Sequence, residues 1–118
     1  MSEAPSYRPE TLAARAGQER SQFGEHSEAL YLTSSFVFKS AAQAARRFSG
    51  EEEGNVYARF SNPTVTMFEE RLAALEGAED AVLFPSGMSA ITTLLLAMLK
   101  PGDHVVVTSD CYRRTRQF

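Results

Sequence analysis

The chain has 118 residues, of which 43% are hydrophobic and 23% are charged, and its formal net charge is −3. This composition is typical of a globular domain and argues against a disordered, fibrous or disulfide-rich chain, and the single cysteine, Cys111, excludes an intrachain disulfide. The sequence has no basic run, no apolar stretch of about 20 residues and no signal-peptide pattern, which favours a cytoplasmic protein that binds neither nucleic acid nor a membrane.

The first half of the chain predicts two short helices and one extended segment. A helix is expected over residues 9–16, because a proline suits its first position and Gly17 suits its end. Residues 30–38 are uncharged and rich in side chains that favour strands. A second helix is expected to run through Phe48, with Ser40 as its amino-terminal cap.

The next helix along the chain has a strong start signal. Asn62 can accept a hydrogen bond from a backbone N–H at the helix start, and the proline after it tolerates the first helical position. Gly77 is expected to end this helix. Its apolar residues recur at spacings of three and four and form one stripe, made of Val65, Phe68, Leu72 and Leu75.

The remainder of the chain predicts a strand, a helix and a second strand. Residues 81–84 and 104–108 are short apolar runs of strand length, and residues 87–99 predict an apolar helix that is buried on most sides. This order indicates a right-handed βαβ crossover and hence an α/β fold with a parallel sheet. Two strands are too few for such a sheet, so the sequence is expected to be the front of a larger α/β domain.

The first candidate site lies between the strand at 81–84 and the helix after it. A helix start offers unpaired N–H groups to an anion, Gly87 permits close approach, and the hydroxyl groups of Ser86 and Ser89 could donate hydrogen bonds. The alternative is that Ser86 only caps a buried helix. Neither a dinucleotide-binding GxGxxG motif nor a P-loop motif occurs in the sequence.

The second candidate is the pair formed by Tyr57 and Arg59. Alternating residues of an extended segment point to one side, and a phenol beside a guanidinium suits an anionic phosphate. The alternative is a tyrosine at an interface and an arginine on the surface.

The third candidate comes directly after the strand at 104–108. Tyr112 could stack on a planar ligand, and the arginines after it could bind a carboxylate or a phosphate. Alternatively, Asp110 caps a helix whose arginines are solvated. No metal site is expected, because the two histidines are isolated in the sequence.

The motifs occur together in one order, Tyr57-Ala-Arg59 with Asn62-Pro-Thr64, then Ser86-Gly-Met88, then Asp110-Cys-Tyr112. In order, spacing and flanking residues they resemble the Cys/Met-metabolism family of pyridoxal 5'-phosphate (PLP) enzymes, over nearly the whole chain from Thr11. Residues 25–38 and 55–77 look most like the O-succinylhomoserine sulfhydrylase branch of this family. Residues 108–116 look more like some cystathionine γ-synthases.

The resemblance implies a fold-type-I PLP-dependent transferase, similar to aspartate aminotransferase. Residues 1–60 would form an amino-terminal arm that contacts a neighbouring subunit, and residues 61–118 would begin the large PLP-binding domain with its parallel sheet. A homo-oligomer is also implied, namely a homotetramer built from dimers that share active sites.

For the cofactor, the resemblance implies two groups of phosphate ligands. Ser86, Gly87 and Met88 match the cup that holds the phosphate at the helix start. Tyr57 and Arg59 match the pair that reaches the phosphate of the neighbouring subunit's cofactor.

For the substrate, the resemblance implies that Tyr112 stacks on the pyridine ring and serves as the catalytic residue for proton transfer. Arg114 or Arg116 would contact the carboxylate of a small amino-acid substrate. Many relatives have two glycines directly after the tyrosine, where this chain has two arginines.

The implied reaction is γ-replacement on O-succinyl- or O-acetylhomoserine by a sulfur nucleophile, in methionine biosynthesis and trans-sulfuration. Alternatives are a cystathionine γ-synthase or a γ-lyase of the same family, and outside it a noncatalytic assembly module or an α/β nucleotide binder. The family's Schiff-base lysine lies beyond this length in relatives, and neither Lys39 nor Lys100 has a matching context. The segment alone is therefore expected to be inactive.

Overall fold

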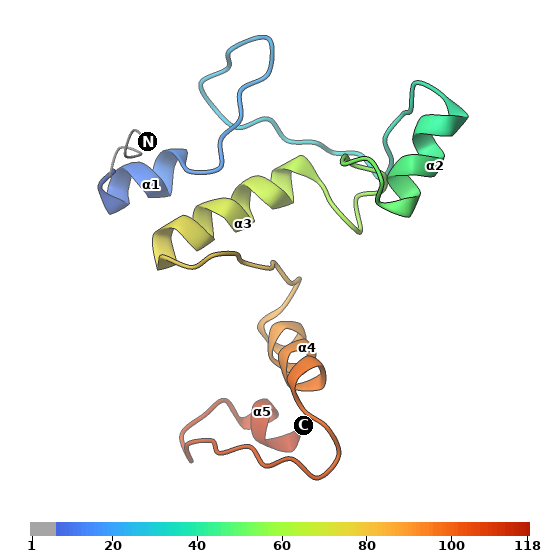
Figure 1. Cartoon of the computed structure of the whole chain (residues 1–118). Helices are drawn as coiled ribbons and strands as arrows, with labels where there is room; N and C mark the ends of the chain where they lie inside the picture. Colours follow the sequence, from blue (N-terminus) through green and yellow to red (C-terminus); the bar gives the residue numbers. More distant parts are fainter. Residues whose placement is uncertain (1–6) are drawn as a thin grey trace, which may run out of the picture. The chain divides into compact units, whose positions relative to one another are not determined.

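The computed structural model describes residues 7–118, which divide into two compact units, the first ending at Ala81 and the second running Val82–Phe118. The first unit contains three helices, and the second contains two (Figure 1). None of the helices in the described range could span a bilayer. In chain order the helices are α1 (Pro9–Arg15), α2 (Ala41–Ser49), α3 (Pro63–Glu76), α4 (Gly87–Met98) and α5 (Arg113–Gln117).

The helices of the first unit begin and end where local signals predict. Pro9 occupies the first position of α1. The Ser40 side chain accepts a hydrogen bond from the backbone N–H of Gln43 at the start of α2, and Asn62 accepts one from Thr64 at the start of α3. Gly77 follows α3 in a left-handed conformation. The predicted bounds of all three helices are confirmed to within one or two residues.

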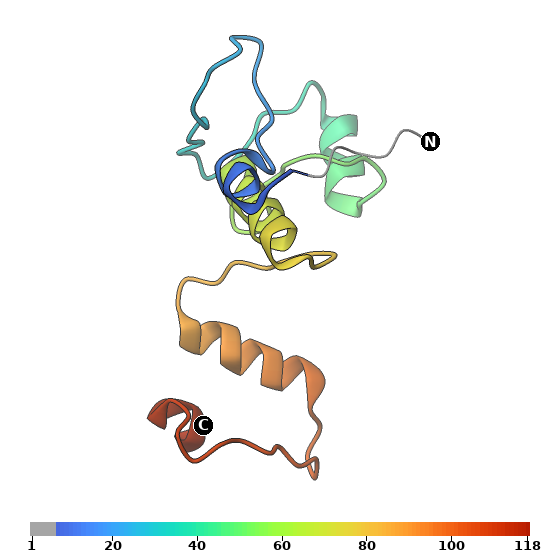
Figure 2. The same cartoon turned by 90° about the vertical axis from the view of Figure 1, so that its left-hand side faces the viewer.

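In the first unit α1 and α3 lie side by side (Figures 1 and 2). Arg71 joins them, because its Nε donates to the backbone oxygen of Ala16 at 2.9 Å and its Nη2 lies 2.5 Å from a carboxylate oxygen of Glu28. Gly17 lies directly against the backbone of Met67. α1 therefore packs on the face of α3 that carries Met67 and Arg71, not on the predicted apolar stripe, where Phe68 stays 45% exposed.

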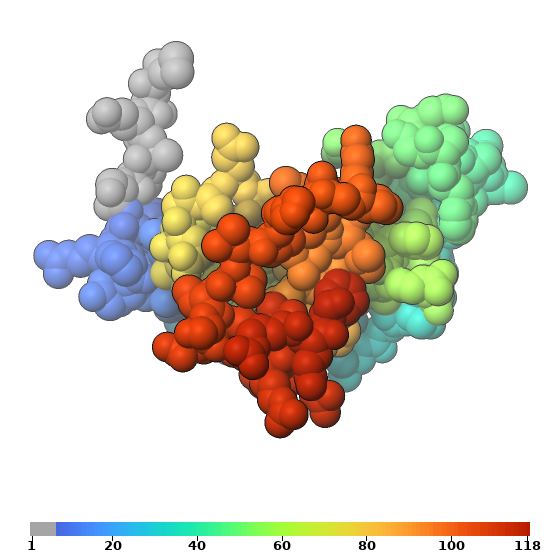
Figure 3. Space-filling model, turned by 90° about the horizontal axis from the view of Figure 1, so that it is seen from below, coloured from blue at the N-terminus to red at the C-terminus, as the bar shows by residue number. Residues whose placement is uncertain are grey.

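The second unit consists of α4, α5 and the segment that joins them. In Figure 3 the residues after α4, in dark orange and red, curve beside the helix. An apolar groove of about 480 Å³ lies between them, and its lining includes Ile91, Leu95, Val105, Val107 and Phe118.

The predicted β-strands are not formed in the part of the chain that the structure describes. Residues 81–84 and 104–108 have no strand partner, and in residues 30–38 the β-pairing is an isolated antiparallel bridge between Ser35 and Tyr57. The hydrogen-bonded strand pair of the predicted βαβ crossover is therefore not formed within residues 7–118. The physical reason is that a strand takes its hydrogen bonds from a neighbouring strand, and a parallel sheet needs more of them than this chain supplies.

The prediction that the apolar helix is buried on most sides is also wrong. In α4 the exposed fractions of Leu94, Leu96 and Met98 are 61%, 72% and 73%. α5 and residues 105–107 cover one side of α4 and leave the rest without a packing partner among residues 82–118.

We expect alanine at position 17 to loosen α1 from α3. Gly17 has a φ of +71°, and an added Cβ would collide with the backbone oxygen of Met67. Both the left-handed conformation and the lack of space oppose a side chain at this position, so we expect Gly17→Ala to lower the stability of the α1–α3 contact by about 1–3 kcal/mol. Faster amide hydrogen exchange in α1 would measure this loss. Gly24→Ala is the matched control, because Gly24 has a φ of +61° but nothing lies within 4 Å of its added Cβ. Equal effects of the two substitutions on α1 would contradict the close approach.

Candidate functional site

The amino-terminal end of α4 is closed by a capping box. Ser86 is extended, and its Oγ accepts a hydrogen bond from the backbone N–H of Ser89 at 3.1 Å. The Oγ of Ser89 accepts in return from the backbone N–H of Ser86 at 3.2 Å. This reciprocal pair fixes the first turn of α4 through local contacts alone.

The capping box leaves two backbone donors free at the helix start. The N–H groups of Gly87 and Met88 have no acceptor within residues 7–118, as is usual for the first amides of a helix. A Cβ added to Gly87 would meet nothing within 4 Å, so a ligand can approach this backbone closely. Free amides at the positive end of a helix dipole suit an anion.

The two serines differ in what they can offer a ligand. The Ser89 hydroxyl donates to the backbone oxygen of Ser86 at 2.7 Å, so within the described residues its proton is used by the capping box. The Ser86 Oγ uses a lone pair for the cap and lies 3.0 Å from the Ser89 Oγ. The cap uses Ser86 only as a hydrogen-bond acceptor. Ser86 can therefore cap α4 and also donate its hydroxyl hydrogen to an anion, so the two roles considered for it are compatible.

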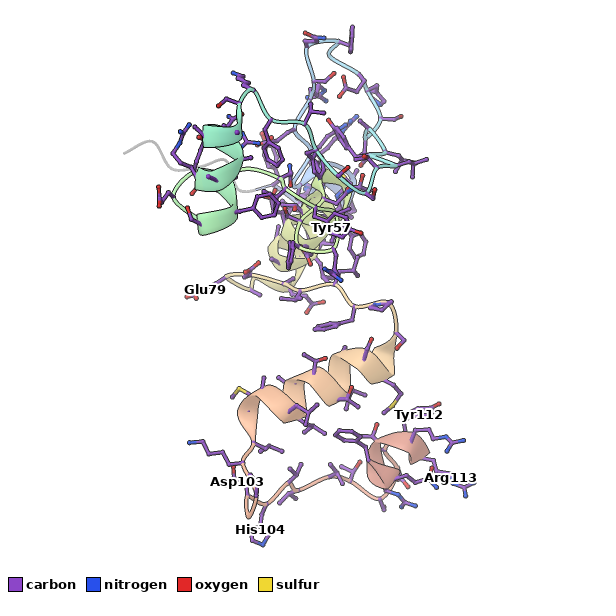
Figure 4. The ribbon with its side chains drawn as sticks, turned by 90° about the vertical axis from the view of Figure 1, so that its right-hand side faces the viewer. Tyr57, Glu79, Asp103, His104, Tyr112 and Arg113 are labelled. Carbon is purple, nitrogen blue, oxygen red and sulfur yellow. The ribbon has the colours of Figure 1, made fainter. Side chains whose placement is uncertain are left out.

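Tyr112 lies directly before α5, with 64% of the residue exposed. Its backbone oxygen accepts a hydrogen bond from the N–H of Thr115 at 2.9 Å, which closes the first turn of that helix. Figures 2 and 4 place the start of α5 at the end of the second unit where α4 begins. The structure thus brings Tyr112 and the start of α4 to the same end of one unit.

The arginines of α5 make only local contacts within the described residues. Arg116 donates from Nη1 to the backbone oxygen of Ser109 at 3.2 Å, and Arg114 donates from Nη1 to the side chain of Gln117 at 3.2 Å. The alternative that Asp110 caps this helix is wrong, because Tyr112 is the N-cap residue and α5 has no side-chain cap.

In the first unit Tyr57 and Arg59 lie together, as predicted, but in a turn. The N–H of Phe60 donates to the backbone oxygen of Tyr57 at 2.9 Å, so the segment is not extended at this point. The Arg59 guanidinium carbon lies 5.4 Å from the centroid of the Tyr57 ring and 5.4 Å from that of Phe60. These cation–π contacts hold the guanidinium beside the exposed tyrosine, which Figure 4 labels.

Residues 31–35 support this turn from a distant part of the sequence. The N–H of Ala58, between Tyr57 and Arg59, donates to the backbone oxygen of Ser34 at 2.9 Å. Ser35 and Tyr57 form the isolated antiparallel bridge.

Two side chains at the start of α3 hold the other end of residues 31–35. Asn62 donates from Nδ2 to the backbone oxygen of Tyr31 at 3.0 Å, and the Oγ1 of Thr64 accepts from the N–H of Tyr31 at 2.9 Å. The sequence identified Asn62 as a helix cap and did not identify the contact with Tyr31. The only sequence signal for this contact is the pair of polar residues, Asn62 and Thr64, on either side of Pro63.

Each unit, taken by itself, has donors whose chemistry fits the phosphate group of a cofactor such as PLP. The second unit offers the amides of Gly87 and Met88 and the hydroxyl of Ser86, and the first unit offers the phenol and guanidinium of Tyr57 and Arg59. Amides at a helix start and a guanidinium are the groups that bind phosphate in proteins.

Comparison with known proteins identifies the family of the chain and several of its relatives. The model of the family described as Cys/Met metabolism PLP-dependent enzyme matches residues 10–118. The chain is 58% identical over 106 residues to O-succinylhomoserine sulfhydrylase of Pseudomonas aeruginosa, covering 90% of this chain and 26% of that protein. It is 44% identical over 110 residues to L-methionine gamma-lyase of Fusobacterium nucleatum subsp. polymorphum, covering 93% and 28%.

A solved structure is similar as well. A Campylobacter jejuni protein described as an O-acetylhomoserine (thiol)-lyase, solved with N'-pyridoxyl-lysine-5'-monophosphate, matches with a TM-score of 0.86 and 32% identity. The match covers 95% of this chain and 28% of that one. The chain thus spans about a quarter of the length of the relatives it matches.

We expect the two serines of the capping box to differ in their contribution to α4. Ser86→Ala removes the acceptor for the Ser89 N–H and should cost about 1 kcal/mol of helix stability. Ser89→Ala keeps that acceptor, loses only the reciprocal contacts and should cost roughly 0.5 kcal/mol. Amide hydrogen exchange over residues 90–95 measures both changes. A larger loss for Ser89→Ala than for Ser86→Ala would contradict the assigned roles.

Proposed function

Because the chain belongs to the Cys/Met metabolism family of PLP-dependent enzymes and has the α/β fold-type-I class expected from its sequence, we propose that it acts, within a longer polypeptide, as part of an O-succinylhomoserine sulfhydrylase. In the proposed γ-replacement, the bond between the γ-carbon and the acyloxy oxygen breaks and a carbon–sulfur bond forms. Bound PLP supplies an electron sink for the negative charge that develops on the substrate.

The start of α4 is the observation that carries the proposal. Its capping box leaves the amides of Gly87 and Met88 free, and Gly87 keeps the approach to them open. A phosphate dianion placed there would accept hydrogen bonds from both amide N–H groups and from the Ser86 hydroxyl, close to the positive end of the helix dipole. We assign this cup to the cofactor phosphate.

The remaining residues have separate proposed roles. Tyr57 and Arg59 bind the phosphate of a neighbouring subunit's cofactor, through a phenol O–H and a charged fork of N–H donors. Tyr112 stacks on the cofactor ring, and its phenol moves a proton during the reaction. Arg114 or Arg116 binds the substrate carboxylate.

Neither lysine of this chain is placed to bind PLP, which supports the proposal that a longer polypeptide is needed for activity. Lys39 and Lys100 are both exposed. The backbone N–H of Lys39 donates to the side chain of Gln43, and that of Lys100 donates to the side chain of Asp103, so both residues belong to local turns. Neither is placed among the proposed phosphate ligands, and we propose that the lysine that binds PLP lies outside residues 1–118.

A γ-lyase is the second candidate function. The identity of 44% over 110 residues with an L-methionine gamma-lyase supports it. The two reactions differ in the step after the γ-substituent has departed: a thiol adds in replacement, and ammonia is released in elimination.

The 118-residue chain alone is expected to be inactive. Given O-succinylhomoserine and sulfide, the longer polypeptide should form homocysteine and succinate, while this chain at equal concentration should form neither above the blank. Quantification of both products by chromatography tests this. Turnover by the 118-residue chain would contradict the proposal, and formation of ammonia and a 2-oxo acid from methionine would support the γ-lyase.

Mixing two inactive variants of the longer polypeptide should restore activity if sites are shared between subunits. An Arg59→Ala subunit lacks a proposed ligand for its neighbour's cofactor, and a Tyr112→Ala subunit lacks a group in its own site. In a hybrid dimer the site of the Arg59→Ala subunit then has both groups intact, while the other site has neither. After refolding an equimolar mixture, we expect about a quarter of the wild-type specific activity, since half of the dimers are hybrids and each hybrid has one intact site.

The control for this experiment is a mixture of Arg59→Ala with Tyr57→Ala. Both lesions fall in the same half of the site, so every site in every dimer remains defective. Recovery in this control, or none in the first mixture, would contradict a shared site in which Arg59 and Tyr112 come from different subunits.

A further inference from the structure

Asn62 is the one buried polar residue among residues 7–118, with 7% of its surface exposed. A helix cap needs only the side-chain oxygen, which here accepts the N–H of Thr64 at 2.9 Å. The amide nitrogen makes a second contact that the cap does not require, to the backbone oxygen of Tyr31 at 3.0 Å. Buried polar groups need partners, and each half of this amide has one.

Thr64 completes the contact with Tyr31. Its Oγ1 accepts the N–H of Tyr31 at 2.9 Å, while Asn62 donates to the oxygen of the same residue. Two side chains therefore bind the N–H and the C=O of one backbone position, as a neighbouring strand would. The Tyr31 backbone is fixed to the start of α3 without any sheet.

The hydrogen bonds continue from Tyr31 to the phosphate-binding pair. The Ser34 oxygen, three residues after Tyr31, accepts the N–H of Ala58, which lies between Tyr57 and Arg59. From Tyr57 the chain makes a single turn and reaches Asn62 again, because the N–H of Ser61 donates to the Tyr57 oxygen at 3.2 Å. The hydrogen bonds and the chain form a closed ring, which we call the frame and define as residues 31–35 and 57–64.

We propose that Asn62 and Thr64 are positioning residues for the binding of cofactor phosphate by Tyr57 and Arg59. This inference rests on the proposed function, in which that pair is a phosphate ligand. Arg59 has a long flexible side chain on a turn, so its affinity for an anion depends on how much freedom the turn loses on binding. The frame restricts the turn before the anion binds, because residues 31–35 on one side and the start of α3 on the other are held together by hydrogen bonds.

The competing interpretation is that Asn62 and Thr64 only stabilise the start of α3. Substitutions that keep the cap and break the frame distinguish the two. Serine is as good a cap as asparagine but cannot donate from the position of Nδ2, so Asn62→Ser retains the helix start and loses the Tyr31 contact. Thr64→Val keeps the shape of the side chain and loses the acceptor, and Thr64→Ser keeps the acceptor.

The experiment measures two quantities in the longer PLP-binding polypeptide. One is the dissociation constant of PLP, from equilibrium titration of the apoprotein, and the other is deuterium uptake of a peptide containing Ala58. We expect Asn62→Ser and Thr64→Val each to weaken PLP binding about threefold to tenfold and to speed exchange at Ala58, as expected for loss of one hydrogen bond. Thr64→Ser should restore both values to those of the parent.

Two further variants make the outcome decisive. Ser40→Ala removes a cap from α2 in the same unit without touching the frame, so PLP affinity should be unchanged. Arg59→Ala tests the proposed function itself. If Arg59→Ala weakens PLP binding while Asn62→Ser and Thr64→Val do not, the positioning role is overturned and the proposed function stands. If Arg59→Ala leaves PLP affinity unchanged, the phosphate role of the pair fails, and the positioning role fails with it.

Discussion

The buried amide of Asn62 joins pieces of backbone that are far apart in the sequence. It caps α3 through Thr64 and binds the carbonyl of Tyr31, and residues 31–35 in turn hold the turn that carries Tyr57 and Arg59. Asn62 and Ala73 are the two buried residues in the described range, each with 7% of its surface exposed. Because so little apolar surface is buried, directional hydrogen bonds from a few side chains fix the arrangement of the first unit.

In the second unit, by contrast, the apolar segments have too few other segments to pack against. α4 presents much of its leucine-rich surface, and Val106 between its half-exposed neighbours is 98% exposed. Apolar surface of this extent favours burial against further strands or another chain. The capping box at Ser86 does not depend on such burial, so the proposed phosphate cup is formed by local contacts alone.

Each unit has its own set of candidate phosphate ligands, and the two sets are built differently. The helix start at Ser86 could be predicted from the sequence, because a strand-length run, a serine and a glycine before an apolar helix specify a helix start. The sequence also paired Tyr57 with Arg59, although it predicted an extended segment and the structure has a turn with a cation–π contact. The support of that turn by Ser34 could not be predicted, because it joins backbone groups 24 positions apart that carry no side-chain signal.

The sequence by itself determined where the helices begin and end and which family the chain resembles. Helix ends depend on hydrogen bonds between residues a few positions apart, so Ser40, Asn62 and Gly77 act wherever the rest of the chain lies. Tertiary structure decided which face of α3 meets α1, whether residues 81–84 and 104–108 find strand partners, and that Asn62 binds Tyr31. These outcomes depend on contacts between distant segments, and neither propensity nor periodicity along one segment contains that information.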